Sequence, residues 1–587
     1  MQQVEIRDGM LVEWDVPLEM DDGVVLRADV FRPPDEGRYP AILTYGPYGK
    51  WLSFQQGYPD AWRRLVEACP EVLEGSSNRY QSWEVPDPER WVPHGYACVR
   101  VDARGWGRSP GRIDPWSPRE AKDLYDCIEW AARQPWCNGR VGLLGISYYA
   151  VNQWHVAALQ PPHLAAMIPW EGFADFYRDM NYHGGIPSDM KEVWYQRTTT
   201  TVQHGLGVRG PKSEITGDLV TGPETLSEEE LAANRVDFVG EIRAHPLDDD
   251  FHRERSARWD LITVPFLSAG NWGGSSLHLR GNVEGFVRAR SPQKWLEVHT
   301  REHWTEFYSR YGFDLQKRFF DHFLKGLDNG WDRTPRVLLR VRTVDDGYVE
   351  RAEDEWPIAR TRWTRLYLDA ASRTLRTDPP EAPGSASFAA LDSPGLTFST
   401  PPLEEEMEVT GPLAAKLFVS STATDADLFL IVRVFRPDGS EVVFQGAVDP
   451  HTPVAHGWLR ASHRKLDPEL STEYRPYHTH DEVQPLTPGQ VCELDVEIWP
   501  TSVIVPAGFR IALSVRGTDY EYEGGDGEVE FGHFRGRKMR GVGIYTHTDP
   551  AHRPRDLYGG TTTIHTGPDH PSFLLLPVVP PKGAAVR

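Results

Sequence analysis

The feature that most constrains the fold is a serine placed between a buried strand and a helix. The apolar strand runs into Gly145-Ile146-Ser147, and helix formers continue from Ala150 to Leu159. In an α/β hydrolase, this strand–turn–helix context exposes a nucleophilic serine at a strained backbone angle. Gly145 has no Cβ to collide with the neighbouring strand. Because Gly-x-Ser alone occurs by chance in a glycine-rich chain, the prediction depends on the flanking strand and helix.

Short apolar runs on both sides of this serine predict a parallel sheet. They are residues 40–45, 97–102, 164–168, 264–268 and 294–298. The first two end in glycine-containing loops, as buried parallel strands do, and helical patterns separate several of the runs. The alternation predicts an α/β-hydrolase domain made of residues 1–172 and 260–334.

Two stretches interrupt this alternation. Residues 173–259 are rich in aromatic and charged residues and in helix formers, without recurring strand signals. They predict a mostly helical cap domain inserted into the hydrolase domain. A second insertion, residues 51–93, follows the first core strand, and we expect it to cover the active-site face as well.

The pattern changes from about residue 335 onward. Apolar and polar residues alternate there, as in Glu493-Leu494-Asp495-Val496-Glu497-Ile498. A period of two with one apolar face predicts antiparallel sheet, and many short strands indicate a sandwich or jelly roll. We therefore expect a jelly-roll β-sandwich domain over residues 335–587. Its many aromatic residues are compatible with a homodimer.

Charge and composition exclude several classes of partner. The formal net charge of −22 argues against binding to nucleic acid or an anionic membrane, since both need a basic patch. Neither a signal peptide nor an apolar run of membrane-spanning length is visible. The five cysteines lack C-x-x-C spacing, so a disulfide framework or zinc site is not expected. We expect a reduced, cytoplasmic protein.

A serine nucleophile needs a general base and donors for the oxyanion. His303 lies beyond the last predicted core strand, where α/β hydrolases place the histidine; His299 is its competitor. The backbone N–H of Tyr148 follows the nucleophile and is expected to point at the developing charge. The loop after the first core strand should supply a second donor, and Tyr48 carries a phenolic O–H there.

Several motifs in order resemble one family. They are Asp102-Ala103-Arg104-Gly105-Trp106-Gly107-Arg108-Ser109-Pro110-Gly111, Gln134-Pro135-Trp136-Cys137-Asn138-Gly139, Gly145-Ile146-Ser147-Tyr148 and Trp499-Pro500-Thr501-Ser502. The chain resembles the CocE/NonD hydrolases, the group of cocaine esterase and X-Pro dipeptidyl-peptidase, over essentially its whole length. The resemblance implies an α/β-hydrolase domain, a helical cap and a C-terminal jelly roll. It also implies that Tyr48 donates to the oxyanion.

The chain departs from the family pattern at two places. Tyr149 and Ala150 stand where the family usually has a glycine, and Ala150 is small enough to let the helix approach the strand. More seriously, the triad aspartate expected in a Gly-x-x-Asp turn is replaced by Gly273.

Three residues are candidates to replace this acid. Glu171 lies at the carboxyl end of the strand at residues 164–168, from which some α/β hydrolases take their acid. Asn271 could orient His303 but carries no charge, and Glu302 is adjacent to His303 in sequence. We favour Glu171, because it preserves both the chain order of the triad and a carboxylate.

The residues therefore predict a serine hydrolase that cleaves carboxylic esters or amides through an acyl-enzyme, without a cofactor or metal. The resemblance implies small acyl substrates and favours an esterase. One alternative is an X-Pro or amino-acyl peptidase of the same fold, for which Asp175 or Asp179 in the cap could bind a substrate amine. Another is a degenerate member that acts as a binding protein through its jelly roll. Asp248-Asp249-Asp250 lacks the spacing of a calcium loop, and His478 with His480 lacks a third ligand.

Overall fold

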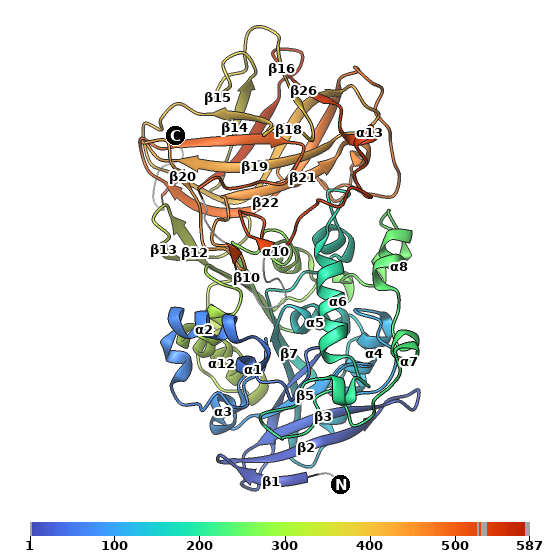
Figure 1. Ribbon diagram of the computed structural model, residues 1–587. Helices are drawn as coiled ribbons and strands as arrows, with labels where there is room; N and C mark the ends of the chain where they lie inside the picture. The colour runs from blue at the N-terminus through green and yellow to red at the C-terminus, as the bar shows by residue number, and fades with distance from the viewer. Residues whose placement is uncertain (1–2, 525–527, 530–536, 582–587) are drawn as a thin grey trace.

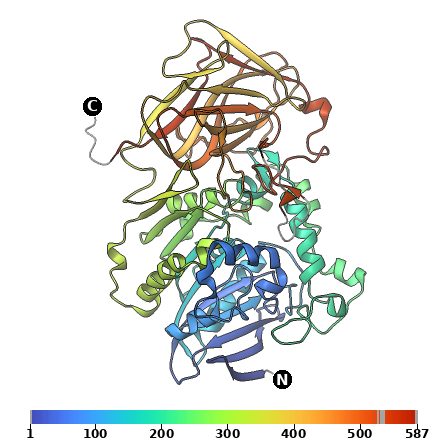
Figure 2. The same cartoon turned by 60° about the vertical axis from the view of Figure 1, so that its left-hand side comes forward.

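The computed structural model describes residues 3–524, 528–529 and 537–581. A sheet with flanking helices occupies the lower part of Figure 1, and a second set of strands lies above it. We call the lower part, residues 3–172 and 260–353, the sheet region. The upper part, residues 362–578, is the all-β region, and the cap is residues 173–259. In both views the cap helix α6 (Met190–Val202) lies beside the sheet region and reaches toward the all-β region (Figures 1 and 2).

The sheet region has a parallel centre with antiparallel edges. Its strands are β1 (Gln3–Arg7), β2 (Met10–Glu19), β3 (Val25–Arg32), β4 (Tyr39–Gly46), β5 (Ala97–Asp102), β6 (Cys137–Ile146), β7 (Leu164–Trp170), β10 (Phe266–Asn271), β11 (Lys294–His299), β12 (Val337–Thr343) and β13 (Tyr348–Glu353). They pair in the order β1-β2-β3-β5-β4-β6-β7-β10-β11-β12-β13, and the pairs from β5–β4 to β11–β12 are parallel. The central strands are almost entirely buried, as expected for a parallel sheet covered on both faces.

The strand order determines where the candidate site forms. The strands predicted from the apolar runs lie at the centre of the sheet, with β4 and β7 on either side of β6. Because parallel strands end at the same edge, the segments that follow β4, β6, β7 and β11 meet there. These segments carry Tyr48, Ser147, Glu171 and His303 respectively.

Helices cover both faces of the sheet. They are α4 (Pro118–Ala132), α5 (Tyr148–Ala157), α10 (Leu279–Arg288), α11 (Thr305–Tyr308) and α12 (Arg310–Lys325). The helix predicted from Ala150 begins directly after Ser147, and every residue of α5 is buried. Helix α12 ends at Lys325, and Gly326, with a φ of 71°, forms its left-handed C-cap.

The two insertions consist mainly of short helices. Residues 51–93 contain α1 (Phe54–Gly57), α2 (Pro59–Ala68), η1 (Pro70–Leu73) and α3 (Pro88–Trp91). The cap contains α6, α7 (Glu228–Ala233), α8 (Phe238–Ala244) and α9 (Asp250–Arg253), a π-helix η3 (Phe176–Asn181) and a small hairpin of β8 (Tyr182–His183) and β9 (Ile186–Pro187).

The all-β region has a core of its own. Its main strands are β14 (Arg362–Asp369), β15 (Thr374–Arg376), β16 (Gly384–Ala389), β17 (Leu396–Ser399), β18 (Met407–Ser421), β19 (Asp427–Phe435), β20 (Glu441–Val442), β21 (Ala455–Arg460), β22 (Cys492–Val505), β23 (Arg510–Arg516), β26 (Thr561–Thr566) and β27 (Phe573–Val578). Their pairings close a circuit from β18 through β22, β21, β19, β23, β17, β15, β14 and β27 back to β18.

The two regions are joined through shared strands. Strand β12 follows the predicted boundary at residue 334, yet it pairs with β11 of the sheet region. At its other end it pairs in parallel with β22 of the all-β region, where Arg342 lies opposite Val503. The all-β region is therefore anchored to the edge of the sheet on which the site is built.

No helix within the described residues has both the length and the apolarity to cross a membrane. All five cysteines are free thiols; four are buried and Cys492 is half-buried.

Candidate active site

Ser147 occupies a strained turn between β6 and α5. Its backbone angles are φ 57° and ψ −115°, a conformation that non-glycine residues rarely adopt. Hydrogen bonds from Ser147 N to the carbonyl oxygens of Trp170 and Glu171, both 3.1 Å long, hold this turn. A Cβ at Gly145 would lie 2.5 Å from Cβ of Tyr149, so glycine is required there.

The bulkier residues after the nucleophile are accommodated by glycines elsewhere. The ring of Tyr149 lies where a Cβ at Gly46 would sit, 2.4 Å away. A Cβ at Gly172 would lie only 2.7 Å from Cβ of Ala150. The departure from the family's usual glycine is thus compensated by glycines at the ends of β4 and β7.

A carboxylate lies directly against His303. Nδ1 of His303 donates to Oε2 of Glu171 at 2.7 Å, and both side chains are buried. Oε1 of Glu171 accepts from Nε2 of His299 at 2.9 Å and from Nδ2 of Asn271 at 3.2 Å. Burial alone would raise the pKa of Glu171, but the charge on His303 and the histidine hydrogen bonds lower it to about 2. Glu171 is therefore an ionised carboxylate at neutral pH.

Among the described residues, none of the other candidates for the acid and the base hydrogen-bonds with the side chain of His303. Asn271 contacts Glu171 and the carbonyl oxygen of Arg301. Glu302 accepts a hydrogen bond from Oγ1 of Thr305. His299 is fully buried behind Glu171 and does not line the pocket at Ser147.

Position 273 has no room for the aspartate of the family pattern. A Cβ at Gly273 would lie 2.2 Å from Cα of Gly446, which belongs to a loop of the all-β region. The same loop binds the sheet region through two backbone hydrogen bonds, Ala447 N to Gly273 O at 3.2 Å and His303 N to Ala447 O at 3.0 Å. The approach of this loop gives a steric reason for glycine at 273.

The second nitrogen of His303 contacts a residue that the sequence analysis missed. Nε2 donates to Oε1 of Glu84 at 3.0 Å, and Glu84 is 4% exposed. Among the described residues, no hydrogen bond joins Ser147 Oγ to His303. Burial by itself would lower the pKa of His303, but Glu171 and Glu84 together raise it to about 10. No motif marked Glu84, because the insertion at 51–93 has no periodic pattern.

Two hydrogen-bond donors lie beside Ser147. Tyr48 lines the same pocket, and its hydroxyl accepts from Nε1 of Trp194 at 3.2 Å, which leaves the hydroxyl proton able to donate. Its loop is held by Lys50, whose backbone N donates to Asp102 at 2.7 Å. The backbone N–H of Tyr148 opens α5, while its phenol donates to Glu120 at 2.6 Å.

The pocket at Ser147 is small, about 70 Å³, and mostly aromatic. Every part of the fold contributes to its wall. The residues are Ser147, Tyr48, Trp116, Phe173, Leu277, His278 and His303 around the ends of the strands, Tyr58, Trp83 and Glu84 from the insertion at 51–93, Met190 and Trp194 from the cap, and Val448, Ile544 and Tyr545 from the all-β region.

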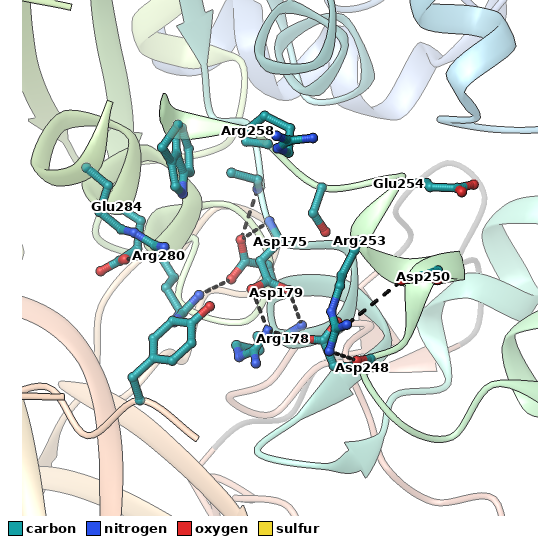
Figure 3. Close-up of a pocket in the computed structure, with 16 residues that line it drawn as sticks. Asp175, Arg178, Asp179, Asp248, Asp250, Arg253, Glu254, Arg258, Arg280 and Glu284 are labelled. Carbon is teal, nitrogen blue, oxygen red and sulfur yellow. Dashed lines mark hydrogen bonds and ion pairs between the residues drawn. The ribbon is translucent and has the colours of Figure 1, made fainter. Parts of the chain in front are cut away.

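A second, larger cavity of about 490 Å³ lies between the cap, α10 and Tyr477 (Figure 3). Asp175 and Asp179, the candidate amine-binding carboxylates, line this cavity and not the pocket at Ser147. Arg178 pairs with Asp175 and Asp248, at 2.9 and 2.8 Å. Arg280 pairs with Asp179 at 3.0 Å. These acidic groups are already neutralised by arginines of the chain itself.

Two side chains that could ligate a metal ion, Asp248 and His480, contact other groups of the protein. Asp248 pairs with Arg178, and Nδ1 of His480 lies 3.1 Å from Nδ1 of His463. Within the described part of the chain, the single group of three convergent ligand atoms belongs to Glu192, Asp549 and His552. Arg243 pairs with both of its carboxylates, so these side chains form an ion-pair cluster.

Comparison with known proteins agrees with this architecture. The family profile of X-Pro dipeptidyl-peptidase (S15 family) matches residues 22–305, and that of the X-Pro dipeptidyl-peptidase C-terminal non-catalytic domain matches residues 329–575. A fold of this type with a serine on the elbow after β6 defines a serine hydrolase, and the protein is one.

Relatives define the family more closely. A CocE/NonD family hydrolase from Staphylococcus aureus is 32% identical, with a TM-score of 0.82 over 97% of this chain and 94% of that one. The cocaine esterase of Rhodococcus sp. is 25% identical over 96% of this chain and 98% of its own length. An Xaa-Pro dipeptidyl-peptidase of Lactobacillus delbrueckii is 20% identical over 88% of this chain and 74% of its own length. The chain belongs to the CocE/NonD family of hydrolases.

Proposed function

We propose that the protein hydrolyses carboxylic esters of small acyl groups through an acyl-enzyme on Ser147. The observation that carries the proposal is the 2.7 Å contact between Glu171 and His303, beside the strained elbow of Ser147. The named esterases among the relatives support an ester substrate. The carboxylate at His303 argues against a degenerate binding protein, because it supplies the acid that Gly273 cannot.

In this mechanism His303 accepts the proton of Ser147 Oγ as the serine attacks the substrate carbonyl carbon. Glu171 keeps Nδ1 protonated and stabilises the imidazolium that forms. The Tyr48 hydroxyl and the Tyr148 N–H donate to the oxyanion. His303 then returns the proton to the departing alcohol, and water activated by the same histidine releases the acid and restores the serine.

The pocket supports a small acyl group. Its volume of about 70 Å³ and aromatic walls leave room for a short chain or a compact ring. A peptidase that binds a substrate amine is the second candidate, favoured by one observation. Glu84 places a buried carboxylate in the pocket, whereas Asp175 and Asp179 lie in the other cavity.

Hydrolysis of p-nitrophenyl esters across acyl lengths tests the proposal. We expect turnover of acetate and propionate esters and a decline with longer acyl chains. Ser147→Ala should reduce kcat by roughly 10⁴-fold or more, because no other group can form the acyl-enzyme. Turnover of X-Pro or amino-acyl anilides but of no ester would favour the peptidase.

We also propose that the all-β region is a jelly roll. The support is its largely antiparallel pairing around a separate apolar core.

A further inference from the structure

Glu84 contacts the nitrogen of His303 that must accept the proton of the nucleophile. The mechanism requires Nε2 of His303 to accept the proton of Ser147 Oγ. In the structure this nitrogen lies 3.0 Å from Oε1 of Glu84, and it donates to that oxygen when Glu84 is ionised. With Nδ1 donating to Glu171, both ring nitrogens carry hydrogen, so the imidazole has no lone pair for the serine.

We propose that Glu84 is a positioning residue that holds His303 away from Ser147 in the free enzyme, and that substrate must displace it before the serine is activated. The inference rests on the proposed function, because it concerns the same serine and histidine. The displacement leaves the atoms in balance: Glu84 exchanges its hydrogen bond with Nε2 for one with solvent or substrate. The imidazolium loses one proton to solvent and becomes the base.

The backbone fixes Glu84 beside the nucleophile. Its carbonyl oxygen accepts from Ile146 N at 3.0 Å, one residue before Ser147. Its φ of 64° lies in the left-handed region, which costs a non-glycine residue energy and is typical of functional sites. Because the main chain is tied to the elbow, we expect release of His303 to come from rotation of the Glu84 side chain away from His303 and Trp83.

The charges around His303 favour the held state. Glu171 and Glu84 face its two nitrogens, and the ring of His278 stacks on it with centroids 5.5 Å apart. Burial lowers the pKa of His278 well below its usual value, so this neighbour is neutral. The imidazolium is therefore stabilised by two carboxylates. The other cation nearby is His299: burial alone would lower its pKa, but Glu297 and Glu171 raise it to about 9, and it shares Glu171 with His303.

The surroundings of Glu84 are apolar or phenolic. Besides His303 and Glu171, the titratable side chains that sense its charge are Tyr48, Tyr58, Tyr149, Tyr308 and Tyr545. Burial raises the pKa of all these phenols, so none carries charge near neutral pH. His303 is thus the cationic partner of Glu84 in this pocket, and removal of the Glu84 charge acts on that histidine.

The test compares Glu84→Gln with Glu89→Gln, which removes a carboxylate from the same segment outside the pocket. Glu89 accepts its hydrogen bonds from Ser76 and Ser77. The rate of Ser147 inactivation by a fluorophosphonate is measured from pH 5 to 10, together with kcat/KM for p-nitrophenyl acetate. Glutamine at 84 should move the acidic limb of both profiles down by about one pH unit or more, a tenfold gain below the limb. Glu89→Gln should follow the wild type.

Each other outcome is decisive. A Glu84→Gln profile that coincides with the wild type overturns the inference while leaving the proposed function intact. A folded variant that is inactive at every pH also overturns it, since Glu84 would then be required for the reaction. If Glu84→Gln does not fold, Glu84→Asp, whose shorter chain withdraws the carboxylate from Nε2, should give a smaller shift in the same direction. Absence of labelling in the wild type and in the Glu84 variants would refute the proposed function itself.

Discussion

The pocket at Ser147 and the cavity at Asp175 both bury acidic and basic side chains, but they pair them differently. In the cavity, Arg178 pairs with Asp175 and Asp248, and Arg280 pairs with Asp179 (Figure 3). Arg280 also pairs with Glu497, which lies outside the cavity lining. In the pocket, one imidazole lies between two carboxylates and has no lone pair left for the serine beside it. Neutralised ion pairs are typical of structural networks, whereas perturbed groups in an apolar pocket are typical of functional sites.

The backbone conformation also differs between the candidate site at Ser147 and the cavity at Asp175. Ser147, Glu171 and Glu84 have φ values of 57°, 48° and 64°, so the serine and both carboxylates that contact His303 lie in the left-handed region. Asp179 and Arg280 are not among the positive-φ residues. Strain of this kind persists only where the surrounding structure imposes it. The candidate site therefore combines buried charge with strained backbone, which the Asp179–Arg280 pair of the cavity does not.

The strongest test of this contrast is Glu171→Gln. Glutamine retains the shape but cannot stabilise the imidazolium, and we expect kcat for a p-nitrophenyl ester to fall by about 10⁴-fold. Glu302→Gln is the matched control, since Glu302 is adjacent to His303 but hydrogen-bonds with Thr305. Near-normal turnover in Glu171→Gln, or a comparable loss in Glu302→Gln, would place the acid elsewhere.

Arg280→Met should affect stability but not chemistry. The substitution leaves the buried Asp179 and the half-buried Glu497 without Arg280, and we expect the unpaired Asp179 to cost about 3–5 kcal/mol in the free energy of unfolding. Thermal unfolding and kcat measured on the same sample separate the two effects. Arg253→Met, on the exposed rim of the cavity, should change neither. A large loss of kcat in a folded Arg280→Met protein would contradict the structural role of this cavity.

Tyr48→Phe should lower kcat, and it should reduce stability less than Arg280→Met does. Loss of one oxyanion donor is expected to lower kcat by about 10²–10³-fold. The loss of stability should be smaller, about 1–3 kcal/mol, because the substitution leaves only the buried Nε1–H of Trp194 without its acceptor. Tyr545→Phe, in the same pocket but not an expected donor, serves as the comparison. Equal kcat values for the two variants would argue against Tyr48 in the oxyanion site.

Local pattern was enough to predict the framework of this site. Ser147 is marked by its strand and helix, and chain order after the core strands leads to Glu171 and His303, which the structure brings into contact. The α/β-hydrolase fold and the family are also predictable, since they depend on buried strands and on motifs of adjacent residues. The antiparallel strands β1–β3 are not among the predicted strands.

What could not be predicted depends on contacts between distant segments. Glu84 lies in an insertion without periodicity, and only folding brings it to a histidine 219 positions away. Val448 and Tyr545 enter the pocket from the all-β region, which has no sequence signal for proximity to Ser147. The assignment of Asp175 and Asp179 to a separate cavity likewise depends on tertiary packing.

The close approach of Gly273 to the loop at Gly446 also limits which halves of related chains could be combined in one protein. The loop closes the pocket, holds the backbone of His303 and occupies the space that an aspartate at 273 would need. A catalytic half borrowed from a relative with that aspartate would collide with this C-terminal half. The acid on β7 and the loop that docks at 273 thus form a linked pair, and recombination between family members would have to transfer both together.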